Sequence, residues 1–433
     1  MRRFSLVAFL AVLAPAAAFS AAVLPQNATD KTLGMGSCAS SLCHGAVETW
    51  KQSNVLQNEY VIWSRRDKHA RAYTVLLGER SKEIAARLEL SAPAHRSALC
   101  LDCHAHNVPE PRRGEHFVIA DGVTCETCHG PAHRWIDSHV ARDNTRKENI
   151  ARGMYPIADP VERARLCLSC HFGNSQKFVT HKMMAAGHPR MSFELDTFTQ
   201  IQPPHYRTDA GQVWDGVRIW AIGQALAAHE LLDMLNDPKR GRDGLFPELV
   251  LFDCHSCHHP MKDKRNAGAR LGLGPGFVRL NDASLLMVRQ IARRLGEEGD
   301  AQFAQQVQRL HRDVARGTDA LAHARAVRQT IAELVPRIGA HRFSPQDLHA
   351  MLIGLIDDGL AGEYSDYQGA EQATMAVQSI ADFMSKQGLL RRPAVGQAMK
   401  RLLAAVARDE QYSEVAFQKA LRDLKSSVGP LAK

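Results

Sequence analysis

Apolar residues recur at three- and four-residue intervals through the last part of the chain, the spacing that lines one face of an α-helix. Six stretches show this pattern, and Gly317 is a point at which the second can break. The predicted helical stretches are 282–296, 301–338, 345–360, 369–388, 392–408 and 413–427. Successive amphipathic helices joined by short loops predict an antiparallel helical bundle.

The first part of the chain has shorter and more broken apolar runs. Two helices are predicted within 59–90, separated near Gly78, and a longer one over 214–235. A run rich in Gly and Pro at 270–278 marks a domain boundary. We therefore expect a first domain at 23–270 and a helical bundle at 276–433.

The beginning of the chain has the order of a secretory signal peptide. Arg2 and Arg3 precede an apolar run from 4 to 18, and small residues that allow cleavage after Ala18, Ser20 or Ala22 follow it. The run is too short for a comfortable membrane span, and an uncleaved anchor is the alternative. The sequence therefore predicts a signal peptide at 1–22, export to the periplasm and no transmembrane segment in the mature chain.

Cysteine placement follows one rule. All ten cysteines form five pairs, and a histidine follows the second member of every pair. Four pairs have the C-x-x-C-H spacing, and the first has two extra residues between its cysteines. The five motifs are Cys38-Ala-Ser-Ser-Leu-Cys43-His44, Cys100-Leu-Asp-Cys103-His104, Cys125-Glu-Thr-Cys128-His129, Cys167-Leu-Ser-Cys170-His171 and Cys254-His-Ser-Cys257-His258.

This rule is typical of c-type haem attachment. Each thiol adds to one vinyl group of the porphyrin, and the following histidine becomes the proximal iron ligand. Zinc sites and disulfides also use paired cysteines, but neither requires a histidine after every second cysteine. Iron–sulfur ligation likewise leaves the histidines unexplained. The sequence therefore predicts five covalently attached haem c groups, with His44, His104, His129, His171 and His258 as proximal ligands.

A second histidine is the usual sixth ligand of such an iron. The candidate distal ligands are His69, His116, His139, His181 and His188. We prefer His139 to His133 as the ligand after the third motif. His205, in a Pro-rich segment, can face either a haem or solvent. His229 is an open candidate, and the neighbours of the last motif, His255 and His259, are expected to be spacers or propionate partners.

Charge argues against a nucleic-acid partner. The formal net charge of +8 falls to −4 once the two leader arginines are removed and ten haem propionates are added. Many basic residues are expected to neutralise propionates, so a high isoelectric point does not indicate nucleic-acid binding here.

Two segments carry a resemblance to a known family. Trp63 with Asp67-Lys-His69-Ala, and Gly122-Val-Thr-Cys-Glu-Thr-Cys-His-Gly-Pro131, resemble the cytochrome c-554 family of periplasmic multihaem cytochromes. That family is related in haem arrangement to hydroxylamine oxidoreductase and the pentahaem nitrite reductases. The likeness covers roughly residues 35 to 260. It implies closely stacked, mostly bis-histidine haems that pass electrons along a chain, and it supports His69 as a distal ligand.

The chain departs from these relatives in two ways. Cytochrome c-554 itself has four haems and no long C-terminal domain. The nitrite reductases place lysine after the second cysteine of the active-site haem, whereas all five motifs here end in histidine. The second departure disfavours this specific reductase.

We expect a mostly α fold in which haems fill the core of the first domain and the bundle covers it. The short gap between the second and third motifs predicts that their haems are neighbours. The bundle histidines, His311, His323, His341 and His349, are expected on the surface. An electron carrier that serves periplasmic or membrane-bound redox proteins is the favoured function, because histidines suffice to cap every iron. The alternative is an oxidoreductase that acts on a small nitrogen or sulfur compound at one open haem.

Overall fold

Helices make up nearly all the regular structure, so the predicted mostly α class is confirmed. The computed structural model describes residues 21–51, 55–207, 215–239, 241–243, 246–259, 277–317, 320–390, 392–429 and 431. The predicted leader, apart from Ala21 and Ala22, and most of the predicted linker at 270–278 lie outside these residues. Over the described ranges, no helix has the length and apolar character needed to cross a membrane.

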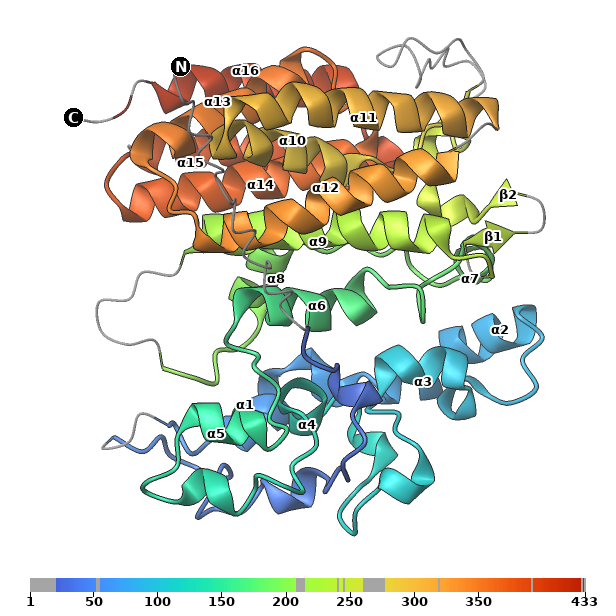
Figure 1. The fold of residues 1–433 in the computed structure, drawn as a ribbon, viewed down its shortest axis with the longest axis vertical. Helices are drawn as coiled ribbons and strands as arrows, with labels where there is room; N and C mark the ends of the chain where they lie inside the picture. The colour runs from blue at the N-terminus through green and yellow to red at the C-terminus, as the bar shows by residue number, and fades with distance from the viewer. Residues whose placement is uncertain are drawn as a thin grey trace, which may run out of the picture.

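Long helices stack in layers in the upper part of the molecule (Figure 1). Their bounds agree within a few residues with the predicted stretches, and Gly317, in the left-handed conformation (φ 66°), follows the end of α11. The helices are α9 (Gly216–Asn236), α10 (Ala283–Leu295), α11 (Glu297–Arg316), α12 (Ala320–Ala340), α13 (Pro345–Leu360), α14 (Tyr367–Lys386), α15 (Arg392–Ala405) and α16 (Glu414–Val428).

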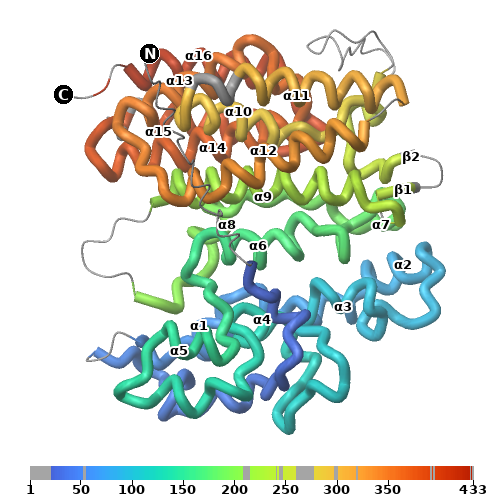
Figure 2. Tube along the Cα trace, in the orientation of Figure 1, coloured from blue at the N-terminus to red at the C-terminus, as the bar shows by residue number. Residues whose placement is uncertain are grey.

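Helix α9 belongs to both halves of the molecule, although the sequence assigned it to the first domain. It contacts α10, α12 and α14 of the bundle, and it also contacts α6 (Pro160–His171) and α8 (Leu195–Ile201) (Figure 2). Trp220 on α9 is fully buried, and the helix contributes to the same apolar core as the bundle. This placement follows from its composition, because a helix that is apolar on more than one face has to be covered on more than one side.

The first half is built from short helices and single turns. Its other α-helices are α1 (Glu59–Arg66), α2 (Glu79–Arg87), α3 (Ala98–His104), α4 (Cys125–His129), α5 (Arg146–Ala151) and α7 (His181–Ala185). The 3₁₀ turns are η1 (Pro25–Asn27), η2 (Met35–Ser37), η3 (Lys68–Arg71), η4 (Thr74–Leu77), η5 (Ala94–Arg96), η6 (Glu110–Arg112), η7 (Ile119–Asp121), η8 (Ser138–Val140), η9 (Leu249–Leu251), η10 (Cys254–Ser256) and η12 (Asp409–Gln411). A two-stranded antiparallel sheet pairs β1 (Arg242–Asp243) with β2 (Phe246–Pro247).

Apolar side chains fill the two halves very unequally. The bundle and α9 share one large buried cluster. The second cluster, around α2 and α3, consists of Leu76, Ala85, Ala94, Leu101 and Ala105. A segment of this length with so small an apolar core needs another source of buried surface. Five porphyrins would supply it.

Arg279 joins the fifth cysteine motif to the bundle. Its guanidinium contacts Asp253, which precedes Cys254, and Asp366, which caps α14. Its Nε lies 3.5 Å from Asp282 at the start of α10. All four side chains are at most 5% exposed. A charge this deeply buried is stable only with such partners, so the network fixes the last motif on the bundle.

One expectation about the bundle histidines is wrong. His311 is 1% exposed rather than a surface residue, and its Nε2 lies 3.2 Å from Asp282. An acidic partner, Asp282 at the start of α10, allows this histidine to be buried.

Replacement of Arg279 by methionine should destabilise the protein by about 3–5 kcal/mol, because it leaves three buried carboxylates without their cation. Urea unfolding followed by circular dichroism measures this change. The control is Arg401→Met, which removes an exposed partner of Asp423 and should cost at most about 1 kcal/mol. Equal losses in the two variants would contradict a structural role for the buried network.

Candidate haem-binding sites

Each motif histidine faces a second histidine from another part of the chain. The ring centres are 6.2 Å apart for His44 and His139, and 6.4 Å apart for His104 and His188. They are 6.5 Å apart for His129 and His205, and 5.9 Å apart for His171 and His69. His258 and His181 form the fifth pair, at 6.1 Å. We number the five sites by their motifs in chain order.

These separations fit a haem iron between two imidazoles. A metal–nitrogen bond to histidine is about 2 Å long and a ring centre lies about 1 Å from its nitrogens, so two axial rings have centres roughly 6 Å apart. A porphyrin supplies the remaining ligands, so two protein side chains suffice. A structural zinc site needs four ligands, and the described part of the chain contains no group of three or more His, Cys, Asp or Glu side chains that could hold a metal ion.

Short helices place the motif residues. His104, His129 and His171 are the last residues of α3, α4 and α6. Cysteines three positions apart on a helix lie on the same face, which suits attachment to one porphyrin. All ten cysteines are described, and no disulfide bond joins any two of them.

The first motif forms a turn instead of a helix. Its longer loop closes through a hydrogen bond from the His44 N–H to the Cys38 carbonyl, 3.2 Å long. The Gly45 N–H bonds the Ser40 carbonyl at 2.9 Å. A side chain at Gly45 would collide with the Ala39 carbonyl, so the turn requires glycine there.

Separate local structures place the partner histidines. His69 lies in η3, capped by Asp67, and His139 lies in η8. His181 begins α7, and its N–H donates to Glu248 at 2.7 Å. His188 follows Gly187, whose φ of 117° turns the chain and whose carbonyl accepts from Arg80 of α2 at 2.7 Å.

Hydrogen bonds at Nδ1 orient six of these rings. His44 donates to Glu59 and His69 to Asp67, both at 2.9 Å. The other four donate to backbone carbonyls: His104 to Ala72, His139 to Ile136, His188 to Pro189 and His205 to Pro203. A proton held at Nδ1 leaves Nε2 as the metal-binding nitrogen. These six histidines therefore make the hydrogen bond at the other ring nitrogen that metal-ligating histidines usually make.

Burial and charge act differently on the rings. Burial, aided by the neighbouring His205 and Arg146, lowers the pKa of His129 to about 4. Burial also lowers the pKa of His171 and His188, so these rings stay neutral, which is the metal-binding form. The hydrogen bonds to Glu59 and Asp67 instead raise the pKa of His44 and His69.

Sequence reasoning and structure differ at one partner. The candidate His116 is exposed, and its ring lies against Gly36. His205, which the sequence left open, is the residue that faces His129. The available signal was the Pro203-Pro204 step, which fixes an extended backbone before His205. His133, the alternative to His139, is exposed.

Two further histidines have other surroundings. His106 is 1% exposed and lies against Phe117. His255 is held by the bundle, because its Nε2 lies 2.8 Å from Asp409 and its Nδ1 accepts from the Tyr367 N–H at 3.3 Å. It ties the fifth motif to the bundle.

Contacts between thiols show which sites are neighbours. Cys38 of the first motif is within hydrogen-bonding reach of Cys125 of the third. Cys103 of the second motif has the same relation to Cys170 of the fourth. The short gap between the second and third motifs predicted that their haems are neighbours. These thiol contacts join the first site to the third and the second to the fourth.

The family comparison covers the same motifs. Residues 37–130 match the family model of cytochrome c554 and c-prime. This segment is cytochrome c-554-like. The match includes the first three motifs, Asp67 and His69, and it supports a c-type cytochrome with covalently bound haem c in electron transfer. No curated protein and no solved structure matches the chain.

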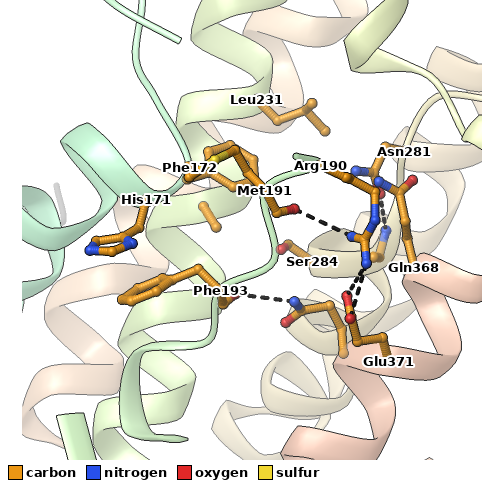
Figure 3. Close-up of a pocket in the computed structure, with 13 residues that line it drawn as sticks. His171, Phe172, Arg190, Met191, Phe193, Leu231, Asn281, Ser284, Gln368 and Glu371 are labelled. Atoms are coloured by element: carbon orange, nitrogen blue, oxygen red, sulfur yellow. Dashed lines mark hydrogen bonds and ion pairs between the residues drawn. The ribbon is translucent and has the colours of Figure 1, made fainter. Parts of the chain in front are cut away.

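A small cavity lies where the fourth site meets the bundle (Figure 3). The His171 ring stacks on Phe193, with centres 4.7 Å apart. Arg190 donates to both oxygens of Glu371 on α14, at 3.0 and 3.1 Å. The cavity of about 40 Å³ has room for a few waters at most. Its lining residues come from both halves, so it lies at the joint between them.

Replacement of His205 by alanine should convert one low-spin haem to a high-spin haem, because it removes the ring that faces His129. Electron paramagnetic resonance of the oxidised protein measures the change, and the reduced variant should bind carbon monoxide. His116→Ala is the matched control and should leave the spectrum unaltered. The reverse result would return His116 to the set of ligands and remove His205.

Proposed function

We propose that this chain is a pentahaem c-type cytochrome of the periplasm that relays electrons between redox partners. The five pairs of facing histidines carry the proposal. Each pair combines a motif histidine with one of His69, His139, His181, His188 and His205.

The residues of each site would hold a haem from three directions. The two cysteines of the motif would attach its edge, and the two facing histidines would be its iron ligands. Bound haem c supplies one-electron chemistry at iron. With an imidazole on each side of the iron, a small substrate would have no open coordination position. This closure favours a carrier over an enzyme.

The contacts between motifs support a route for the electrons. The first site adjoins the third, and the second adjoins the fourth. Cys128 of the third motif is also close enough to Cys167 and Cys170 of the fourth for their charges to interact. We infer that electrons pass through the sites in the order first, third, fourth, second, or the reverse.

The fifth site is placed differently, because it is fixed to the bundle. Asp253 and His255 bind the bundle from either side of Cys254. Arg190, which holds Glu371 of α14, is also close enough to Cys254 to affect its pKa. We infer that the bundle covers the haem half and fixes the fourth and fifth sites. Periplasmic or membrane-bound redox proteins would be the partners, in agreement with the signal peptide expected at 1–22.

The haem content and the spin state test this proposal together. A haemochrome assay on purified protein should give five haems per chain. The oxidised protein should show low-spin signals alone, and carbon monoxide should not change the optical spectrum of the reduced protein. One high-spin haem that binds carbon monoxide would contradict the carrier. That outcome would favour an oxidoreductase, to be assayed with hydroxylamine, nitrite and sulfur oxyanions.

A further inference from the structure

Two carboxylates each contact a histidine of a different site, one at the first and one at the fourth. Glu59 Oε2 accepts from His44 Nδ1, and Asp67 Oδ1 accepts from His69 Nδ1. Both distances are 2.9 Å. A carboxylate at this position does more than orient a ring, because it draws the Nδ1 proton and makes the imidazole a stronger electron donor.

The backbone holds Glu59 in place. It is the first residue of α1, and its Oε1 accepts from the N–H groups of Leu56 and Gln57 at 2.9 and 3.1 Å. Its side chain is 15% exposed. The other oxygen, Oε2, is thereby directed to His44.

Asp67 is held still more firmly. Its Oδ1 also accepts from the His69 N–H at 3.0 Å, and its Oδ2 accepts from Gln202 Nε2 at 3.2 Å. The side chain is 7% exposed. Asp67 thus accepts hydrogen bonds from His69 and Gln202 at both of its oxygens, which is the arrangement that suits an ionised carboxylate.

The second site offers the contrast. His104 Nδ1 donates to the Ala72 carbonyl at 3.0 Å, and His188 Nδ1 donates to the Pro189 carbonyl at 2.8 Å. Both acceptors are neutral. A hydrogen bond to a charged acceptor is roughly twice as strong as one to a neutral acceptor, so the rings at the second site keep more of their Nδ1 proton.

We propose that Glu59 and Asp67 are positioning residues that lower the reduction potentials of the first and fourth haem sites relative to the second. The inference rests on the proposed haem ligation. A more electron-rich imidazole and a nearby negative charge both favour ferric over ferrous iron. An electron on this relay would therefore rest at the second site in preference to its neighbour, the fourth.

Conservative substitutions test each carboxylate in the complete haem-loaded protein. Asp67→Asn keeps a good capping side chain and removes the charge. A spectroelectrochemical titration should show a higher midpoint potential for one haem. The expected change is about tenfold in the ratio of reduced to oxidised haem, which corresponds to 59 mV for a one-electron couple. Glu59→Gln should raise a different midpoint. Asp423→Asn, which removes an exposed carboxylate from α16, is the matched control and should move none.

Gln202 provides a test of opposite sign. Gln202→Leu removes a donor from Asp67 while the carboxylate stays, so Asp67 binds the His69 proton more strongly. The potential of the same haem should fall, by less than Asp67→Asn raises it. General loosening of the site would not move one haem in opposite directions. If Asp67→Asn loses its low-spin signal, the direction of the Gln202→Leu shift decides.

The possible outcomes separate this inference from the proposed function. Five low-spin haems whose midpoints do not respond to Asp67→Asn, Glu59→Gln or Gln202→Leu would overturn the tuning role and leave the carrier intact. Equal shifts in Asp423→Asn would also overturn it, because the effect would then be one of net charge. Fewer haems or a high-spin site in the unaltered protein would overturn both.

Discussion

The structure depends on a fixed gap between two imidazole rings, which occurs five times. The members of a pair are far apart in sequence: His129 and His205 are 76 positions apart, and His69 and His171 are 102. Each gap therefore acts as a long-range cross-link once an iron fills it. The first half has a small apolar cluster of its own, so in the proposed haem protein these cross-links and the porphyrins would take the place of a side-chain core. Folding of this half is expected to require haem attachment.

The bundle imposes a different kind of order. Its apolar core is continuous through α9, so it can fold on side-chain packing alone and present a rigid surface. Arg190 and Arg279 fasten the fourth and fifth motifs to that surface through carboxylates on α14 and at the start of α10. The proposed haems would thus hold one half of the molecule, whereas packing holds the other. The joint between them consists of charge pairs in a largely buried setting.

The sequence predicted what depends on local pattern. Helical periodicity placed the bundle helices to within a few residues, because each apolar face extends over several turns. Attachment motifs were recognisable because cysteine and histidine occupy fixed neighbouring positions. Which two histidines face each other depends instead on how turns that are distant in sequence pack together. That is why the sequence included the exposed His116 and left His205 open, and why the buried His311 was expected on the surface. The contacts of the second motif with the fourth were hidden for the same reason.

The facing pairs of histidines also show which part of the chain could form an independent structural module. The segment with the family match, 37–130, contains three complete attachment motifs. Yet His44, His69, His104 and His129 all find their partners beyond its end, at 139, 171, 188 and 205. The segment that shows ancestry is therefore not an independent module. The smallest piece that closes the first four sites extends to His205, so any recombination or truncation that preserves capped haems must respect that longer span.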